Sequence, residues 1–161
     1  MNMDEEFLEL NDLDWFTSCQ EGGVLHFATA GKGFIPQVIR ASIENYEEIY
    51  DYFFSRVANS DVEVIENNLP VFISQLERDR YLQCFCDMAR KGVYSYDFSQ
   101  GEKYKLIARP VTPLAFSKLP ERVRRIISKA PLSPTFFMDV SELKKIDSVI
   151  AGSGQCADDK G

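Results

Sequence analysis

The chain has 161 residues, of which 45% are hydrophobic and 27% charged, and its formal net charge is -7. A domain of this size buries about 70% of the surface that its unfolded chain exposes, so we expect it to fold without disulfides or metal. No apolar run approaches the roughly 20 residues that span a bilayer, so we expect no membrane-spanning segment.

The charge is unevenly distributed along the chain. Residues 1–70 carry 14 acidic and 3 basic side chains, a net charge of -11, whereas residues 71–130 carry 12 basic and 6 acidic side chains, a net charge of +6. The acidic total disfavours nucleic acid as a ligand, and an acidic face can steer a basic protein partner. The first six residues are acidic where a signal peptide would be basic, so we expect a cytoplasmic protein without membrane association.

The cysteine pattern argues against a disulfide framework and against a metal site. The four cysteines are Cys19, Cys84, Cys86 and Cys156, none of them in a C-x-x-C pair, and the only histidine is His26. Zinc sites usually combine such pairs with nearby histidines. We therefore predict reduced thiols, no metal and no cofactor.

Two β-hairpins are predicted. Segments 13–19 and 24–30 flank a Glu-Gly-Gly turn, and segments 93–98 and 104–108 flank a Ser-Gln-Gly-Glu turn. Glycine in such turns provides the positive φ that a tight connection requires, and the flanking aromatic and β-branched residues favour strands.

Helices are predicted between and after the hairpins. Ser42 is a suitable N-cap for a helix whose apolar stripe recurs at three- and four-residue steps, and Ser74 begins a capping box. A third helix is expected over 119–130, a short one over 141–146, and a flexible tail over 151–161. The stripe of the first helix is Ile43, Tyr46, Tyr50, Phe53, Phe54 and Val57. The predicted architecture is a single α+β domain over 1–150, in which two antiparallel hairpins form a sheet packed by two to three helices.

The candidate binding surface is the polar face of the first of these helices. Glu44, Glu47, Glu48 and Asp51 fall outside its apolar stripe and should face solvent. Like charges four residues apart cost a helix a few tenths of a kcal/mol, so this face is carried at a small loss of stability. We predict that it binds a basic protein partner, although a solvated surface has the same pattern.

Two other functions remain open. Cys19 and His26 lie on the two strands of the first hairpin, so a small cytosolic enzyme with a Cys–His pair is one alternative, although no orienting residue or surrounding motif identifies it. The basic residues from Lys118 to Lys129 allow a regulatory nucleic-acid-binding protein, although that segment has no interleaved aromatics. No catalytic motif is present, so we expect a protein that is not an enzyme.

Two stretches together resemble a known group of proteins. The first contains Asp14-Trp15-Phe16, the Gly22-Gly23 turn and His26-Phe27-Ala28-Thr29-Ala30-Gly31; the second contains Tyr94-Ser95-Tyr96-Asp97, Leu106-Ile107-Ala108-Arg109-Pro110 and Leu119-Pro120. Across residues 13–127 the chain resembles small bacterial proteins of the kind found as immunity proteins beside polymorphic toxins. The resemblance implies a non-catalytic protein that neutralises a cognate toxin by binding it, often with an acidic surface against a basic toxin. It identifies no functional residue.

Overall fold

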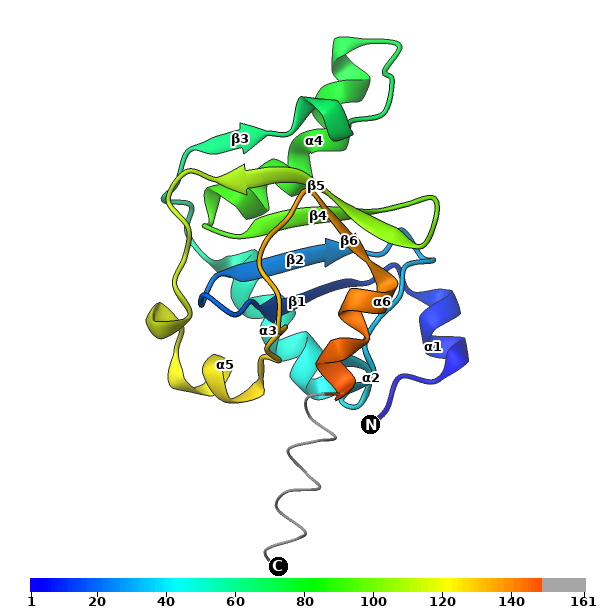
Figure 1. The fold of residues 1–161 in the computed structure, drawn as a ribbon, viewed down its shortest axis with the longest axis vertical. Coiled ribbons are helices and arrows are strands. Elements are labelled where there is room, and N and C mark those ends of the chain that lie inside the picture. Colours follow the sequence, from blue (N-terminus) through cyan, green and yellow to red (C-terminus); the bar gives the residue numbers. More distant parts are fainter. Residues whose placement is uncertain (149–161) are drawn as a thin grey trace, which may run out of the picture.

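The computed structural model describes residues 1–148 of the chain. Within them the chain forms an α+β fold, in which one six-stranded sheet is packed by helices (Figure 1). This confirms the fold class predicted from the sequence. None of the described helices combines the length and the apolar character needed to cross a membrane. The tail predicted over 151–161, which includes Cys156, lies outside the described residues.

Both predicted hairpins are present, because β1 pairs antiparallel with β2 and β4 pairs antiparallel with β5. Their turns contain Gly22 at φ 89° and Gly101 at φ 83°, a conformation that glycine adopts without steric cost. The strands are β1 (Asp14–Ser18), β2 (Val24–Ala28), β3 (Val62–Val64), β4 (Tyr94–Ser99), β5 (Lys103–Pro110) and β6 (Phe137–Asp139).

A parallel pair between β2 and β4 joins the two hairpins into one sheet, with the strand order β1-β2-β4-β5-β3. Strand β6 pairs with β5 near the start of β5, and β3 pairs with its end. The parallel junction and β6 were not predicted. Both depend on contacts between distant segments, and β6 has only three residues, too few for an alternating pattern to be visible.

The two long helices begin where the sequence predicted. The Ser42 hydroxyl accepts a hydrogen bond from the Asn45 amide at 3.1 Å, and the Ser74 hydroxyl accepts one from the Glu77 amide at 3.1 Å. The helices are α1 (Glu5–Leu10), α2 (Gln37–Arg40), α3 (Ile43–Ser55), α4 (Gln75–Arg90), α5 (Glu121–Ile126) and α6 (Val140–Leu143), with 3-10 turns η1 (Glu66–Asn68) and η2 (Phe116–Lys118).

The apolar stripe predicted for α3 is partly wrong. The buried residues of this helix are Ile49 and Phe53, whereas Val57 lies beyond its end and is 80% exposed. The helix stops because Arg56 adopts an extended backbone, and its side chain donates to the Lys91 carbonyl at 3.2 Å. This difference in the apolar stripe does not change the side of the helix that carries the acidic residues.

Buried side chains fill both faces of the sheet. Trp15 and Phe27 stack at 4.3 Å on one face, where α6 and β6 contribute Leu143 and Met138. Phe16 lies on the other face in a layer shared with α3 and α5, while α4 packs against β4 and β5. In Figure 1, α4 runs behind the sheet and α6 lies in front of it.

The outer edge of β1 is covered at its last residue, Ser18, by the segment that follows α5. The Ser18 amide donates to the Ser128 carbonyl at 2.9 Å, and the Ala130 amide donates to the Ser18 carbonyl. An edge strand paired in this way is protected from pairing with another chain. The same segment holds α5 beside α3, which brings the basic helix against the acidic one.

Candidate functional site

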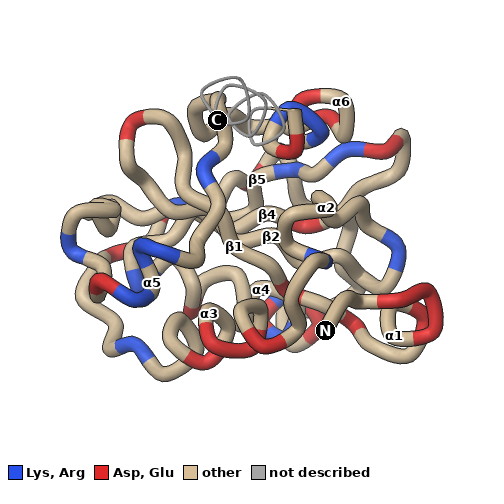
Figure 2. The backbone as a smooth tube through the Cα atoms, turned by 90° about the horizontal axis from the view of Figure 1, so that it is seen from below, with Lys and Arg blue, Asp and Glu red and all other residues tan. Residues whose placement is uncertain are grey.

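The structure places the four predicted binding residues on the outer side of α3, as expected. Glu44, Glu47 and Asp51 are exposed, and Glu48 is half-buried. In Figure 2 the acidic residues of α3 and α1 lie along one edge of the molecule, and the basic residues of α5 lie on the neighbouring side.

Two of these four carboxylates already have partners within the chain. Glu48 accepts a hydrogen bond from the Arg122 guanidinium at 2.6 Å, and Glu44 lies 2.8 Å from the Met1 amino group. Glu47 and Asp51 form no ion pair within residues 1–148. The negative charge available to another molecule is therefore concentrated on Glu47 and Asp51.

Glu47 and Asp51 line an open groove of about 430 Å³ between α3 and the segment from α1 to β1. Asp12 contributes a third carboxylate from the opposite side, and none of the residues around the groove is a lysine or arginine. We call this feature the acidic groove. Its lining consists of Phe7, Asn11, Asp12, Leu13, Tyr46, Glu47, Tyr50 and Asp51.

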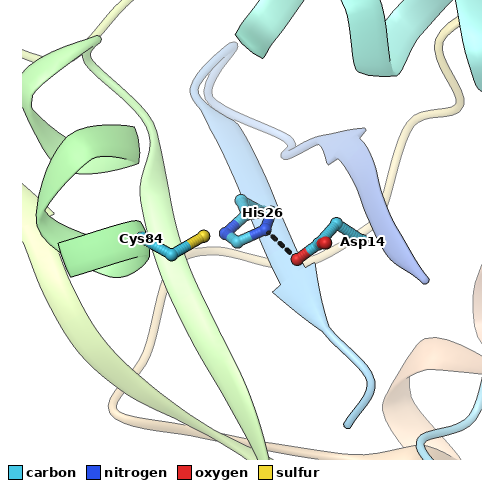
Figure 3. Close-up of side chains that lie close together, drawn as sticks. All are labelled: Asp14, His26 and Cys84. Atoms are coloured by element: carbon cyan, nitrogen blue, oxygen red, sulfur yellow. Dashed lines mark hydrogen bonds and ion pairs between the residues drawn. The ribbon is translucent and has the colours of Figure 1, made fainter. Parts of the chain in front are cut away.

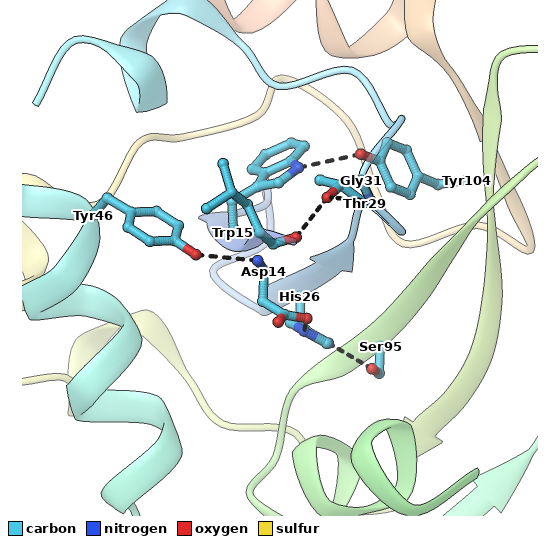
Figure 4. Close-up of polar contacts among 9 residues, drawn as sticks. Asp14, Trp15, His26, Thr29, Gly31, Tyr46, Ser95 and Tyr104 are labelled. Carbon is cyan, nitrogen blue, oxygen red and sulfur yellow. Dashed lines mark hydrogen bonds and ion pairs between the residues drawn. The ribbon is translucent and has the colours of Figure 1, made fainter. Parts of the chain in front are cut away.

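Two tyrosines give the acidic groove an aromatic wall. The rings of Tyr46 and Tyr50 lie 6.1 Å apart, and Tyr50 stacks on Phe54 at 4.0 Å. The Tyr46 hydroxyl accepts a hydrogen bond from the Asp14 amide at 3.1 Å, so its position is fixed by β1 (Figure 4). Burial raises the pKa of the Tyr46 hydroxyl, which therefore stays neutral at physiological pH. Sequence reasoning placed both tyrosines on the buried stripe and missed this wall.

A second polar cluster lies on the face of the sheet that α3 and α4 cover, next to the acidic groove. In the first hairpin Asp14 lies opposite Ala28, so His26 is its diagonal neighbour on the same face. The parallel junction sets His26 directly beside Ser95 of β4. The turn alone predicts the Asp14–His26 contact, whereas the contact with Ser95 requires the junction.

His26 bonds through both ring nitrogens. Its Nε2 lies 2.8 Å from the Asp14 carboxylate and its Nδ1 lies 2.7 Å from the Ser95 hydroxyl (Figure 4). His26 and Ser95 are fully buried, and the ring lies between Phe16 at 5.1 Å and Phe85 at 6.5 Å. A serine with no exposed surface cannot attack a bound substrate, so this cluster holds three strands together rather than forming a hydrolase triad.

Cys84 of α4 completes this cluster. One donor atom each from Asp14, His26 and Cys84 lie within 4.8 Å of one another (Figure 3). Burial, followed by the nearby charge of Asp14, raises the pKa of the Cys84 thiol to about 11. A neutral thiol is a poor nucleophile, so the chain alone does not activate it.

The Cys19–His26 pair considered as a catalytic alternative is not formed in the structure. Cys19 packs in the core layer around Trp15, while His26 faces the opposite layer and bonds to Asp14 and Ser95. Burial raises the pKa of the Cys19 thiol, which opposes thiolate formation. Cys19 lies beyond the end of β1, where the chain turns, whereas His26 lies within β2.

The arginine side chains of the basic helix α5 bond to other residues of the same chain. Arg122 bonds to Glu48, and Arg125 bonds to Glu121 at 2.6 Å one turn away. Arg124 donates to the Ser117 carbonyl at 3.4 Å. These contacts reduce the positive charge that α5 offers to a phosphate backbone.

Comparison with known proteins adds no assignment: no protein-family model, curated protein or solved structure matches this chain. The functional reading therefore depends on the groove and on the cluster beside it. The groove presents unpaired charge to solvent, and the cluster is largely closed.

Proposed function

We propose that this chain is a non-catalytic, cytoplasmic protein-binding domain that holds a basic partner in the acidic groove, as an immunity protein holds its toxin. The observation that carries the proposal is the convergence of Asp12, Glu47 and Asp51 on one groove without a compensating cation among its lining residues. Carboxylates arranged in this way attract a basic partner and speed its association.

The shape and chemistry of the groove indicate what it accepts. A volume of about 430 Å³ suits one or two long side chains rather than a whole secondary-structure element. A lysine or arginine side chain of the partner fits there, because its charge meets the carboxylates and its aliphatic part can pack against Tyr46 and Tyr50. Tyrosine and arginine are enriched among the few positions that dominate binding energy.

The catalytic alternative has less support. His26 and Ser95 are fully buried, and the pKa values of Cys19, Cys84 and Cys86 are all raised by burial. Each of these features opposes nucleophilic chemistry at neutral pH.

The test uses the protein encoded beside this one as the binding partner. The association rate constant is measured against salt concentration for the unaltered chain and for a double variant, Glu47→Lys with Asp51→Lys. We expect the double variant to associate about 10-fold or more slowly at low salt and to lose most of the salt dependence.

The matched control is Asp79→Lys with Asp139→Lys, which makes the same change in net charge at exposed positions outside the groove. This control should change the rate much less. Equal slowing in both double variants would show that net charge, not the groove, attracts the partner. Absence of binding to the neighbouring protein would remove the immunity assignment.

A further inference from the structure

The cluster beside the groove combines three kinds of metal ligand. Asp14 comes from β1, His26 from β2 and Cys84 from α4, and their donor atoms lie within 4.8 Å of one another (Figure 3). Among the described residues this is the one such group of three. Three separate elements of the fold thus bring a carboxylate, an imidazole and a thiol close together, with the imidazole between the other two in Figure 3.

The three donors lie no more than 4.8 Å apart, which is within reach of a tetrahedral site. Zinc binds sulfur at about 2.3 Å and nitrogen or oxygen at about 2.0–2.2 Å, which sets the donors about 3.2–3.7 Å apart. The His26 Nε2 and the Asp14 carboxylate are now 2.8 Å apart. A metal ion would replace the proton that they share, and modest side-chain rotations would bring the three donors to bonding distance.

The surroundings of His26 match those of a metal ligand. A metal-bound histidine usually donates its other ring N–H to an oxygen, which fixes the ring and raises its basicity. The Ser95 hydroxyl lies 2.7 Å from Nδ1 and can accept that hydrogen bond while Nε2 binds the metal. The histidine side chain is fully buried, so its orientation is set by packing before any ion arrives.

Charge balance also favours a cation at this point. The side chain of Asp14 is 22% exposed, and within residues 1–148 its one ion pair is with His26, with no lysine or arginine. A largely buried carboxylate needs a compensating charge. A metal ion bound here would provide that charge.

The cluster lies next to the acidic groove. The Asp14 amide bonds to the Tyr46 hydroxyl, and both Leu13 and Tyr46 line the groove. The carboxylates of the groove would concentrate divalent cations near the partly exposed side of the cluster.

We propose that Asp14, His26 and Cys84 form a three-ligand site for a divalent transition-metal ion of the zinc class, with a fourth position left for water or a partner side chain. A mixed oxygen, nitrogen and sulfur set selects zinc or cobalt over magnesium and calcium, which prefer oxygen ligands alone. The site does not depend on the identity of any protein partner.

The experiment titrates the full chain with Co²⁺ and follows the near-ultraviolet absorption of a cobalt–thiolate bond, after which Zn²⁺ is added to displace the cobalt. The unaltered chain should show this absorption with one ion bound. Cys84→Ser should lose the absorption and weaken zinc binding by about 100-fold or more. Asp14→Asn should keep the absorption but bind zinc about 10- to 100-fold more weakly.

The matched controls are Cys86→Ser, two residues away on α4 but outside the cluster, and Cys156→Ser. Both should retain the absorption and the affinity. Far-ultraviolet circular dichroism checks that each variant is folded. If Cys84→Ser does not fold, the zinc affinity of Asp14→Asn is the test of the site. The proposal is overturned if the unaltered chain gives no cobalt–thiolate absorption, if Cys84→Ser retains it, or if Cys86→Ser loses it.

Discussion

The Arg122 guanidinium lies 2.6 Å from the Glu48 carboxylate, which ties the basic helix α5 to the acidic helix α3. The arginine side chain is 70% exposed, so solvent screens the pair and its contribution to stability is small. Its larger effect is on the charge that α3 presents, because Arg122 offsets one carboxylate next to the acidic groove.

Arg122→Ala should therefore leave the melting temperature nearly unchanged and raise the association rate constant with a basic partner about 2- to 3-fold at low salt. Stopped-flow mixing with the partner measures the rate. Arg125→Ala removes the same charge from a pair made within α5 and should have a smaller effect. Equal acceleration in the two variants would contradict a specific role for the Arg122–Glu48 pair.

The hydrogen bond between His26 and Ser95 should contribute to folding stability. Ser95→Ala leaves the His26 Nδ1 without its partner in a fully buried position, which costs about 1–3 kcal/mol of unfolding free energy. Urea denaturation of the metal-free protein measures this loss. Ser141→Ala, at an exposed position, should change stability by less than about 0.5 kcal/mol. A similar small change for Ser95→Ala would show that the bond is not required.

Gly92 and Gly101 allow the cost of backbone conformation to be separated from the cost of crowding. Both have positive φ, 92° and 83°, but a Cβ on Gly92 would lie 2.7 Å from the Leu114 amide nitrogen, whereas a Cβ on Gly101 would meet nothing within 4 Å. Each substitution by alanine should cost about 1–2 kcal/mol for the backbone, and Gly92→Ala about 1–3 kcal/mol more. Equal losses in chemical denaturation would mean that Leu114 moves away freely.

The half-buried thiol of Cys84 should react slowly in the metal-free protein. Its pKa is raised to about 11, mainly by burial, against about 8.5 for a free cysteine. Alkylation by iodoacetamide at pH 8 should be about 100-fold slower than that of free cysteine and should accelerate up to about pH 11. Mass spectrometry resolves the rate at Cys84 from that at Cys86. A rate that levels off below pH 8 would restore the possibility of an activated thiol.

The same pKa shift sets the direction of a change in stability. Because the folded state holds the Cys84 proton more tightly than the unfolded state, stability is unaffected below about pH 8 and falls between about pH 8.5 and 11. Cys84→Ser should remove part of this alkaline loss. Cys19 and Cys86, whose pKa values are also raised, add to the loss over the same range, and Tyr81 adds to it from about pH 10 upward.

Local sequence signals were sufficient for the elements that depend on neighbouring residues. Ser42 and Ser74 identified the starts of the long helices, and the glycine turns identified both hairpins, because caps and turns are decided within a few residues. The parallel junction and β6 depend on segments that meet only after folding, so no local pattern indicates them.

The candidate site likewise has one part that the sequence predicts and one part that depends on tertiary packing. The solvent-facing side of α3 was predicted from helical spacing, but the pairing of Glu48 with Arg122 was not, because it depends on how α5 docks. The contact of Asp14 with His26 follows from the register of the hairpin, whereas Cys84 arrives only through packing of α4 on the sheet. Spacing along the chain therefore does not indicate a cluster whose side chains come from three elements.

The parallel pair of β2 and β4 has a consequence for how the chain is made. Ser95 lies 69 residues after His26, so it is synthesised later. The first hairpin therefore leaves the ribosome with the β2 edge that pairs with β4 still unpaired. Until the second hairpin follows, this nascent segment is exposed to mispairing, and a nascent-chain chaperone that shields residues 24–28 would protect it.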